Sequence, residues 1–450
     1  MSIQPKLKAF DTTMIVISMI IGAGIFRTPS EVALKAGSVE LFYGAWILGG
    51  VIAILGALTF AELGARRPVA GGYYALVSHA YGTDVAFMLN WTVLIVSGVN
   101  LAVVTMIGVD YLAPLLFELG LPEIDRRWVG LTLIGVLYVV NLRGIQVGAV
   151  FQNILSVLKV VLILVVACLA LAAGVIETAA PASEIARDAT HETSFLLALG
   201  ASLVPVFFTF GGYQMITNVS GDVRDPQHNI PRGVILGVGT VFTLYLLINV
   251  AYVQTLGLGG VAASTKVAGD LAGVVFGPWG DRVLSIMVFL SVLGFMNVAF
   301  IHMPRGYLAM AEDGVLPSIF GRVHPKTQVQ NFGLTFFVAS ILLAMMFLGD
   351  FGKMLDFVMF IDILAMAVLA TTLFVLRRRG EGDDTPYQVP LYPWLPLLYT
   401  GVLFAVVLSV FINDVFVYQR YHTLVSLGLL AAGLPLSRLF QRGSKTLDHG

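Results

Sequence analysis

The stretch Ile20-Ile21-Gly22-Ala23-Gly24-Ile25-Phe26 lies in the middle of the first apolar segment and decides how the rest of the chain is interpreted. Uncharged residues run from Thr12 to Phe26, but three consecutive small residues replace good helix formers near the end of this run. We predict that the helix breaks here, so that unpaired N–H and C=O groups face inward. Within a membrane such groups are tolerated only where they line a cavity or are buried in protein. Close packing of two helices on the small residues is the alternative.

The composition is that of an integral membrane protein. Of 450 residues, 58% are hydrophobic and only 12% are charged, and the mean hydropathy is +0.89. A soluble domain needs a charged surface that no part of this chain offers. The net charge of -1 gives no indication of nucleic-acid binding. The single cysteine, Cys168, excludes an intrachain disulfide, and we expect no cleaved signal peptide.

Apolar runs between charged residues predict an all-α membrane protein with twelve transmembrane helices. Their approximate cores are 12–36, 41–61, 85–109, 128–142, 144–176, 194–220, 233–256, 283–314, 332–349, 354–376, 391–413 and 421–437. An even number puts both termini on one side, where an excess of lysine and arginine predicts the cytoplasm and hence the cell (inner) membrane. After the second segment, the aromatic-rich connection 66–81 predicts a short interfacial helix, or a simple aromatic anchor.

The sixth segment repeats the pattern of the first. Residues 193–221 carry no charge, Pro205 bends the first part, and Gly211-Gly212 fall in the middle, followed by Tyr213-Gln214. Two breaks at corresponding places in two five-helix halves are typical of an inverted-repeat transporter with its site at the midplane. The predicted organisation is a leader (1–10), a first repeat (11–176), a second repeat with its preceding loop (177–379), and two additional helices with a tail (380–450).

Five motifs in chain order resemble the amino acid/polyamine/organocation (APC) superfamily of transporters, and within it the bacterial relatives of the L-type amino acid transporters. The motifs are Asp11 to Pro29 around the first break, Ala61-Glu62-Leu63-Gly64, Arg67-Pro68 with Gly71-Gly72 and Tyr74, Gly221 to Arg232, and Asn297 with Pro304-Arg305 and Ala309 to Pro317. The resemblance covers nearly the whole chain. It implies a five-plus-five inverted repeat with discontinuous helices 1 and 6, two additional C-terminal helices, and alternating access.

The resemblance also implies how a substrate is held. The carboxylate binds amides of the first break, and the ammonium binds carbonyls at both breaks. On this chain the amides map onto Gly22, Ala23 and Gly24, and the carbonyls onto Ile20, Phe208 and Gly211. Family members often carry serine where Ala23 stands, so only backbone donors remain here.

Lys159 lies in the middle of the fifth segment, with no charge within ten residues on either side. A buried unpaired ammonium is costly, so this group must be paired, hydrated or neutral. The resemblance implies that its charge stands in for a sodium ion. We therefore predict sodium-independent transport with the ammonium on a carbonyl near the first break; snorkelling to the interface is the alternative.

Other polar residues within the segments have two interpretations each. Asp362 is a possible proton site, or a protonated group hydrogen-bonded to a neighbouring helix. His302 is more simply a packed polar residue than a ligand, and Glu62 is expected to be shallow enough for solvation. Gln214, Asn100 and Asn297 are candidates for lining a cavity, with polar contacts between helices as the competing role, favoured for the two asparagines.

If the backbone holds the carboxylate and the ammonium, side chains around the breaks determine substrate specificity. Phe208, Phe210 and Tyr213 flank the second break, and we predict that they close over the substrate as a gate. No residue mapped nearest the site is charged, unless Asp362 or His302 reaches it. A neutral amino acid is therefore the expected substrate.

No motif of a soluble enzyme is present: the chain lacks GxxxxGK[ST], HExxH and CxxC, so we expect no catalytic residues, metal or cofactor. The alternatives are a proton-coupled amino acid or polyamine symporter, a channel, or a membrane sensor. Some relatives pair with a glycoprotein through a cysteine, but Glu118 to Trp128 contains none, so we expect no disulfide-linked subunit. Exchange and facilitated transport, and the oligomeric state, stay open, with a monomer plausible.

Overall fold

A computed structural model describes residues 5–118, 125–174, 195–347, 352–417 and 422–447. In these ranges the chain is almost entirely helical, and extended backbone pairs only in a single bridge between Leu7 and Val223. The predicted boundary between two repeats at 176–177 lies outside the described residues, as does most of the loop 118–128.

Each predicted apolar segment is occupied by one or two helices. The α-helices are α1 (Ala9–Ile20), α2 (Thr28–Ala36), α3 (Val39–Arg66), α4 (Gly72–Tyr81), α5 (Thr83–Glu118), α6 (Arg126–Leu142), α7 (Ile145–Ala173), α9 (Phe195–Phe210), α10 (Pro226–Ala263), α11 (Val267–Phe276), α12 (Gly280–Glu312), α13 (Asn331–Phe347), α14 (Gly352–Arg378), α15 (Trp394–Ile412) and α16 (His422–Leu447). Shorter elements are the 3-10 helices η1 (Gly24–Phe26), η2 (Tyr213–Asp222), η3 (Gly277–Trp279) and η4 (Ser318–Gly321), and the π-helical turn η5 (Asn413–Val417).

The helices confirm a multi-pass membrane architecture. Among the described residues, 8 helical stretches are long and apolar enough to cross a membrane, and three shorter apolar helices accompany them. α6 has 17 residues, as expected for the short segment between two arginines. The exact number of crossings stays a prediction.

Both predicted interruptions are present. α1 ends at Ile20 and α2 begins at Thr28, while α9 ends at Phe210 and gives way to the 3-10 helix η2. α4 also confirms the short helix expected within the connection 66–81. α11 lies between two predicted segments, 233–256 and 283–314, where no element was predicted; α10 continues across a kink at Gly257 and α11 follows shortly after it.

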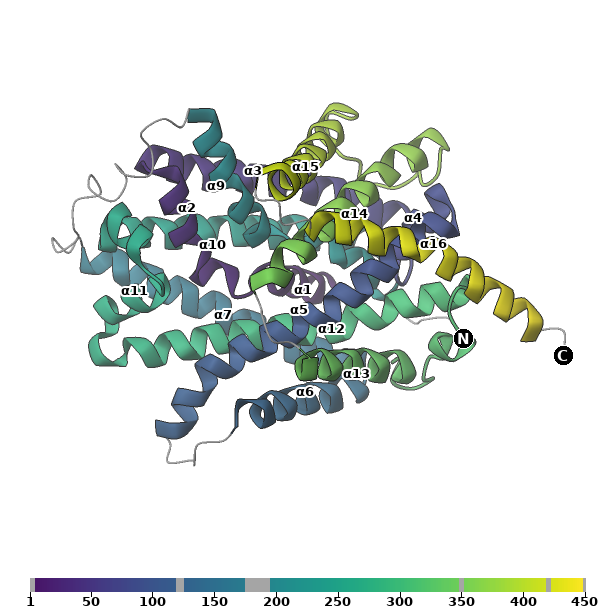
Figure 1. Ribbon diagram of the computed structural model, residues 1–450, viewed down its shortest axis with the longest axis horizontal. Helices are drawn as coiled ribbons and strands as arrows, with labels where there is room; N and C mark the ends of the chain where they lie inside the picture. The colour runs from purple at the N-terminus through teal and green to yellow at the C-terminus, as the bar shows by residue number, and fades with distance from the viewer. Residues whose placement is uncertain (1–4, 119–124, 175–194, 348–351, 418–421, 448–450) are drawn as a thin grey trace.

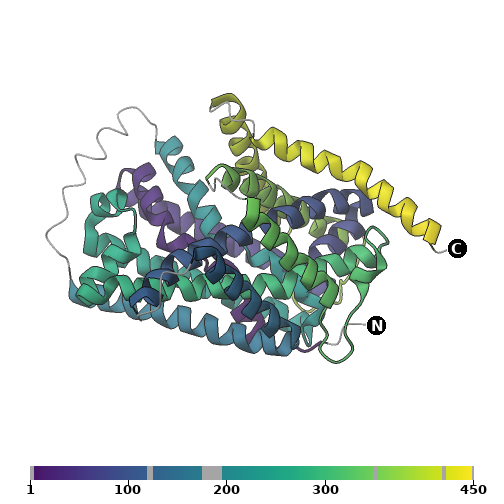
Figure 2. The ribbon, with the colours of Figure 1, turned by 60° about the horizontal axis from the view of Figure 1, so that its bottom comes forward.

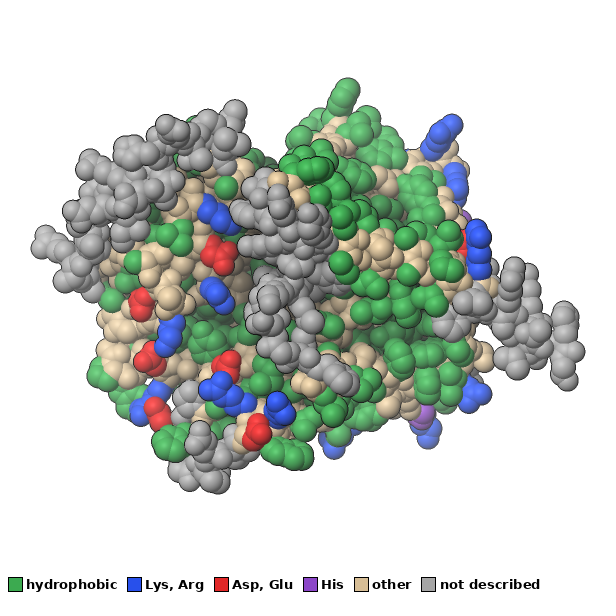
Figure 3. Space-filling view, viewed as in Figure 1, with side chains coloured by type: hydrophobic (Ala, Val, Ile, Leu, Met, Phe, Trp, Pro, Cys, Tyr) green, Lys and Arg blue, Asp and Glu red, His purple; other side chains and the backbone are tan. Residues whose placement is uncertain are grey.

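α1 lies at the centre of the molecule, packed against α7, α10, α12 and η2 (Figure 1). α2 and α9 lie side by side and contact α3, so the two interrupted segments run next to each other. α16 runs along the outside and extends past the bundle (Figure 2). Hydrophobic side chains cover much of the middle of the face in Figure 3, whereas charged side chains gather towards the two ends. This arrangement suits a bundle embedded in a bilayer.

Candidate functional site

The first break exposes backbone donors. After Ile20 the amide of Gly22 donates to the Ile20 carbonyl at 2.9 Å, and the chain then forms the η1 turn. Among the described residues, no acceptor meets the amides of Ala23 and Gly24, and both residues are half-buried. Two of the three predicted donors are therefore available to a ligand. Gly22 is a correction, because its N–H is already used within the turn.

The second break is fixed by a glycine that no other residue can replace. Gly212 adopts φ 111°, and a Cβ at this position would lie 2.3 Å from the Met19 carbonyl oxygen at the end of α1. Its amide donates to Oε1 of Gln214 at 2.9 Å. The two breaks are thus in direct contact. The sequence predicted only that they occupy corresponding positions in the two halves of the chain.

Tyr245 of α10 joins the two breaks and was not anticipated. Its hydroxyl lies 3.3 Å from the Ile20 carbonyl oxygen and 3.4 Å from that of Thr209, and its ring packs on Phe210 and Trp46. One hydroxyl proton serves both carbonyls in turn. No signal within the apolar run of α10 distinguishes this tyrosine from a core aromatic.

The predicted ammonium acceptors differ in availability. The Ile20 carbonyl already accepts from Gly22 and shares the Tyr245 hydroxyl with Thr209, so it has little acceptor capacity left, and its assignment as an ammonium acceptor stays a prediction. The Phe208 carbonyl accepts one bond, from Gly211 at 3.3 Å. The carbonyl of Gly211 accepts none from the described residues, and its backbone is half-buried. The acceptors that remain lie on the second break.

Of the three predicted gate residues, only Phe208 is accessible. Its side chain is 42% exposed, whereas Phe210 and Tyr213 are buried. Phe210 packs in an aromatic cluster with Trp46 and Tyr245, and the Tyr213 hydroxyl lies 2.9 Å from that of Tyr399. Phe210 and Tyr213 are thus packed in the core in this conformation, and the assignment of these residues to a gate stays a prediction. Residues that point outward on a helical wheel were not separable from core aromatics in such an apolar sequence.

Gln214 lies inside the break rather than on its surface. The side chain is fully buried, with Oε1 on the Gly212 amide, and Nε2 has no partner among the described residues. The side chain therefore stabilises the unwound backbone. An unused buried amide donor costs about 1–3 kcal/mol.

Lys159 confirms the predicted contact with the first break. Its ammonium donates to the Ile21 carbonyl at 2.9 Å and to the Ser291 carbonyl of α12 at 3.3 Å, and the side chain is buried. A Cβ at Gly294 would lie 2.9 Å from Nζ, so the glycine makes room for the ammonium. One cation thus ties α7 to the broken segment and to α12, and snorkelling is excluded.

Asn297 belongs to a buried polar chain that links four helices. Its Nδ2 donates to Oε1 of Gln152 at 2.8 Å, and its Oδ1 accepts from Asn141 at 2.8 Å. Gln152 bonds to Ser156, whose hydroxyl lies 2.7 Å from that of Ser18 on α1. These contacts give Asn297 the interhelical role. Asn100 is half-buried on α5.

His302 and Asp362 are the remaining ionisable candidates in the apolar segments. His302 is buried, with Nδ1 3.4 Å from Nδ2 of Asn218, in agreement with a packed polar residue. Asp362 lies within electrostatic range of Tyr73 and Tyr399. The Tyr73 hydroxyl is buried without a partner among the described residues.

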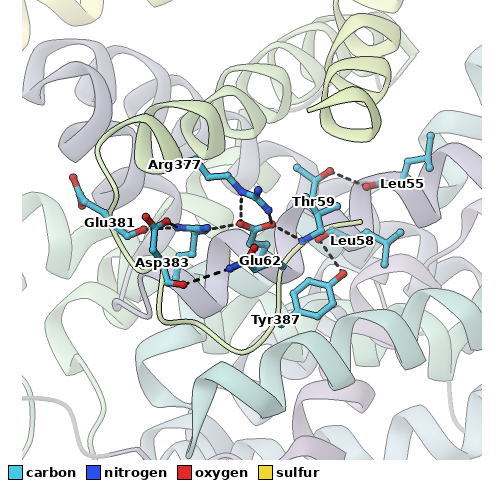
Figure 4. Close-up of polar contacts among 11 residues, drawn as sticks. Leu55, Leu58, Thr59, Glu62, Arg377, Glu381, Asp383 and Tyr387 are labelled. Atoms are coloured by element: carbon cyan, nitrogen blue, oxygen red, sulfur yellow. Dashed lines mark hydrogen bonds and ion pairs between the residues drawn. The ribbon is translucent and has the colours of Figure 1, made fainter. Parts of the chain in front are cut away.

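Glu62 is not solvated, which corrects the expectation from sequence. Its carboxylate is fully buried and accepts hydrogen bonds from the Arg66 and Arg377 guanidinium groups and from the Val389 amide (Figure 4). Arg66 continues to Asp383 at 2.9 Å. The cluster fixes the α14–α15 connection to the end of α3.

A second buried ion pair joins η2 to α12. Arg305 of α12 binds Asp222 at the end of η2 through two bonds of 2.8 and 2.9 Å. The Asp222 carbonyl accepts from the amides of Lys6 and Leu7 at 2.8 and 2.9 Å, so the N-terminal segment lies against it. The N-terminal segment, η2 and α12 are therefore joined by these contacts.

Comparison with known proteins agrees with this geometry. The family model described as amino acid permease matches residues 7–431. The chain is 27% identical to the serine/threonine exchanger SteT of Bacillus subtilis over 404 residues, covering 89% of this chain and 90% of that protein. It is 30% identical over 402 residues to the human large neutral amino acids transporter small subunit 2 (86% and 73% covered). It is 26% identical over 442 residues to the human cystine/glutamate transporter (97% and 85% covered).

Two interrupted helices in contact, with free backbone donors and acceptors, are what the resemblance to the APC superfamily implied, and the family match spans nearly all of the chain. The protein therefore belongs to the amino acid permease family of the APC superfamily, as a relative of the L-type amino acid transporters, and is a multi-pass membrane transporter rather than an enzyme.

Proposed function

We propose that the protein is a sodium-independent transporter of neutral L-amino acids that works by alternating access, as an exchanger or a facilitator. One observation carries the proposal: unpartnered amides of Ala23 and Gly24 on the first break lie in the same region as the Gly211 carbonyl on the second. An amino acid zwitterion has a carboxylate for the two amides and an ammonium for the carbonyl. Helix termini favour such charges by about 0.3–1 kcal/mol at exposed sites and more where they are partly buried.

In this arrangement the substrate carboxylate accepts from Ala23 and Gly24, and the ammonium donates to Gly211 and to the remaining lone pair of Phe208. The break residues 20–26 and 208–214 carry no charge, so a charged substrate side chain finds no counter-ion on them. The accessible Phe208 ring covers the site when it closes. A neutral amino acid fits these features best.

Lys159 supplies a fixed positive charge where a sodium-coupled relative would need an ion. Its ammonium already occupies the carbonyls of Ile21 and Ser291, one from each side of the site. The unwound backbone is thereby held without a bound cation. This contact is the basis for proposing that transport is independent of sodium.

We further propose five-plus-five inverted repeats over 11–176 and 177–379, followed by the two helices of 380–450. The end that holds the Arg305–Asp222 pair faces the cytoplasm of the cell (inner) membrane and is closed in this conformation. Breaking that pair would open the site inward. The name of the SteT relative, a serine/threonine exchanger, supports exchange over facilitation. No disulfide-linked subunit is needed.

The test is counterflow in proteoliposomes made from the purified protein. Vesicles loaded with an unlabelled neutral amino acid should accumulate the labelled form to a saturable level, equally in sodium and potassium buffers. A channel would show no saturable counterflow. Uptake that requires a sodium gradient would remove the role given to Lys159, and no uptake of any amino acid would remove the proposal.

A proton-coupled symporter is the second candidate, and Asp362 is the observation that favours it. This carboxyl group lies near Tyr399, whose hydroxyl contacts Tyr213 at the start of η2, so its protonation can be transmitted to the second break. Asp362→Asn should then abolish the acceleration of uptake by an inward proton gradient. Identical pH profiles for the variant and the original protein would eliminate this mechanism.

A further inference from the structure

Phe295 of α12 lies against the first break, where no sequence pattern placed it. A Cβ built on Gly22 would lie 3.7 Å from Cδ2 of the Phe295 ring, which is ordinary van der Waals contact. Gly22 and Phe295 are both half-buried, so each keeps part of its surface accessible. On the other side of the break, Gly24 faces the Thr209 side chain, with a Cβ-to-methyl separation of 3.4 Å. The space beside the free amides is therefore bounded on two sides.

The ring is held in this position by its neighbour along the helix. Gly294 lies against the Lys159 ammonium, which also binds the Ser291 carbonyl one turn earlier. These contacts fix how close α12 comes to the break and how it is rotated about its axis. Phe295 follows by one helical step and so remains directed at Gly22.

We propose that Phe295 limits the substrate to small neutral amino acids, of the size of glycine, alanine, serine and threonine. The inference rests on the proposed function: with the carboxylate on Ala23 and Gly24, the α-carbon lies next to the break, and the substrate side chain meets the Phe295 ring. A leucine or phenylalanine side chain would have to displace a ring that lies beside Gly22. Interiors accept such added volume poorly.

The test is a binding screen of the purified full-length protein with L-alanine, L-serine, L-threonine, L-leucine and L-phenylalanine, read by displacement of labelled L-alanine. The original protein should bind the small substrates about tenfold or more tightly than leucine. One extra methylene in a closed apolar site already changes discrimination by about that factor. Phe295→Ala should gain leucine affinity by a similar factor while it keeps alanine binding. Phe295→Leu should fall between them.

Leu293→Ala is the matched control, since it shortens a half-buried side chain two residues away, about 200° around the same helix by helical geometry. It should leave the order of affinities unchanged. Retained alanine binding shows that each variant is folded. A protein that binds leucine as well as alanine, or a Phe295→Ala variant that binds alanine but gains no leucine affinity, overturns this inference while the transport function stands. Failure to bind any amino acid would instead remove the proposed function itself.

Discussion

Replacing Lys159 by alanine tests the centre of the mechanism. The substitution removes an ammonium that donates to the Ile21 carbonyl at 2.9 Å and to the Ser291 carbonyl at 3.3 Å. Hydrogen bonds to charged groups contribute about 1.5–3 kcal/mol each, so two are worth about 3–6 kcal/mol. Relief of the buried charge offsets part of this loss. We expect a net weakening of substrate binding by about 1.5–3 kcal/mol, which is about 10–100-fold in affinity.

The two carbonyls left behind face a space that the side chain occupied, and oxygen ligands of this kind suit a hard cation. In potassium buffer, Lys159→Ala should therefore bind labelled amino acid weakly, and sodium should restore part of the affinity. The original protein should show no difference between the two buffers. Lys35→Ala, at an exposed position on α2, is the control and should behave like the original protein.

Two outcomes would refute this reasoning. If Lys159→Ala bound substrate in potassium as tightly as the original protein, the ammonium would have no part in holding the unwound segment. If the original protein needed sodium, its lysine would not replace the ion. Melting temperatures measured without ligand separate a loss of folding from a loss of binding, because only the second depends on substrate concentration.

Three further substitutions test other parts of the structure. Tyr245→Phe keeps the ring packing but removes the hydroxyl between the two breaks, so KM should rise about 2–10-fold, the effect of about 0.5–1.5 kcal/mol. Gly212→Ala should abolish transport, since its Cβ would meet a carbonyl of α1 at 2.3 Å, whereas Gly239→Ala, with nothing within 4 Å, should be neutral in uptake assays. Glu62→Gln removes the buried carboxylate shared by Arg66 and Arg377, so that Arg66 keeps only the carboxylate of Asp383, and it should destabilise the protein by about 3–5 kcal/mol, seen as a lower melting temperature. The exposed Glu40→Gln should leave that temperature unchanged.

The sequence was informative wherever an unusual residue stood in an apolar run. Two glycine-containing stretches, 22–24 and 211–212, lie within apolar segments that are expected to cross the membrane. The structure interrupts both helices at these stretches. The contact of Lys159 could also be predicted, because a lone charge within the membrane needs a polar partner. Rare residues thus located the centre of the site.

The sequence could not predict which way a common side chain points, into the core or towards the surface. Phe208 and Phe210 are two positions apart and chemically identical, yet one is exposed and the other is packed on Tyr245. Phe295 and Tyr245 reach the breaks only because the fold brings α12 and α10 against them, and no local sequence pattern predicts such contacts. Glu62 seemed shallow because the residues that cover it come from a connection more than 300 positions later.

The N-terminal segment has a practical consequence for anyone who handles this protein. Because the amides of Lys6 and Leu7 donate to the Asp222 carbonyl and the Asp222 side chain binds Arg305, the segment ahead of α1 is tied to the ion pair between η2 and α12. We expect an affinity tag fused just ahead of these residues to disturb these contacts and to change the rate of transport. A tag at the C-terminal end is the better choice, because α16 runs along the outside and extends past the bundle (Figure 2).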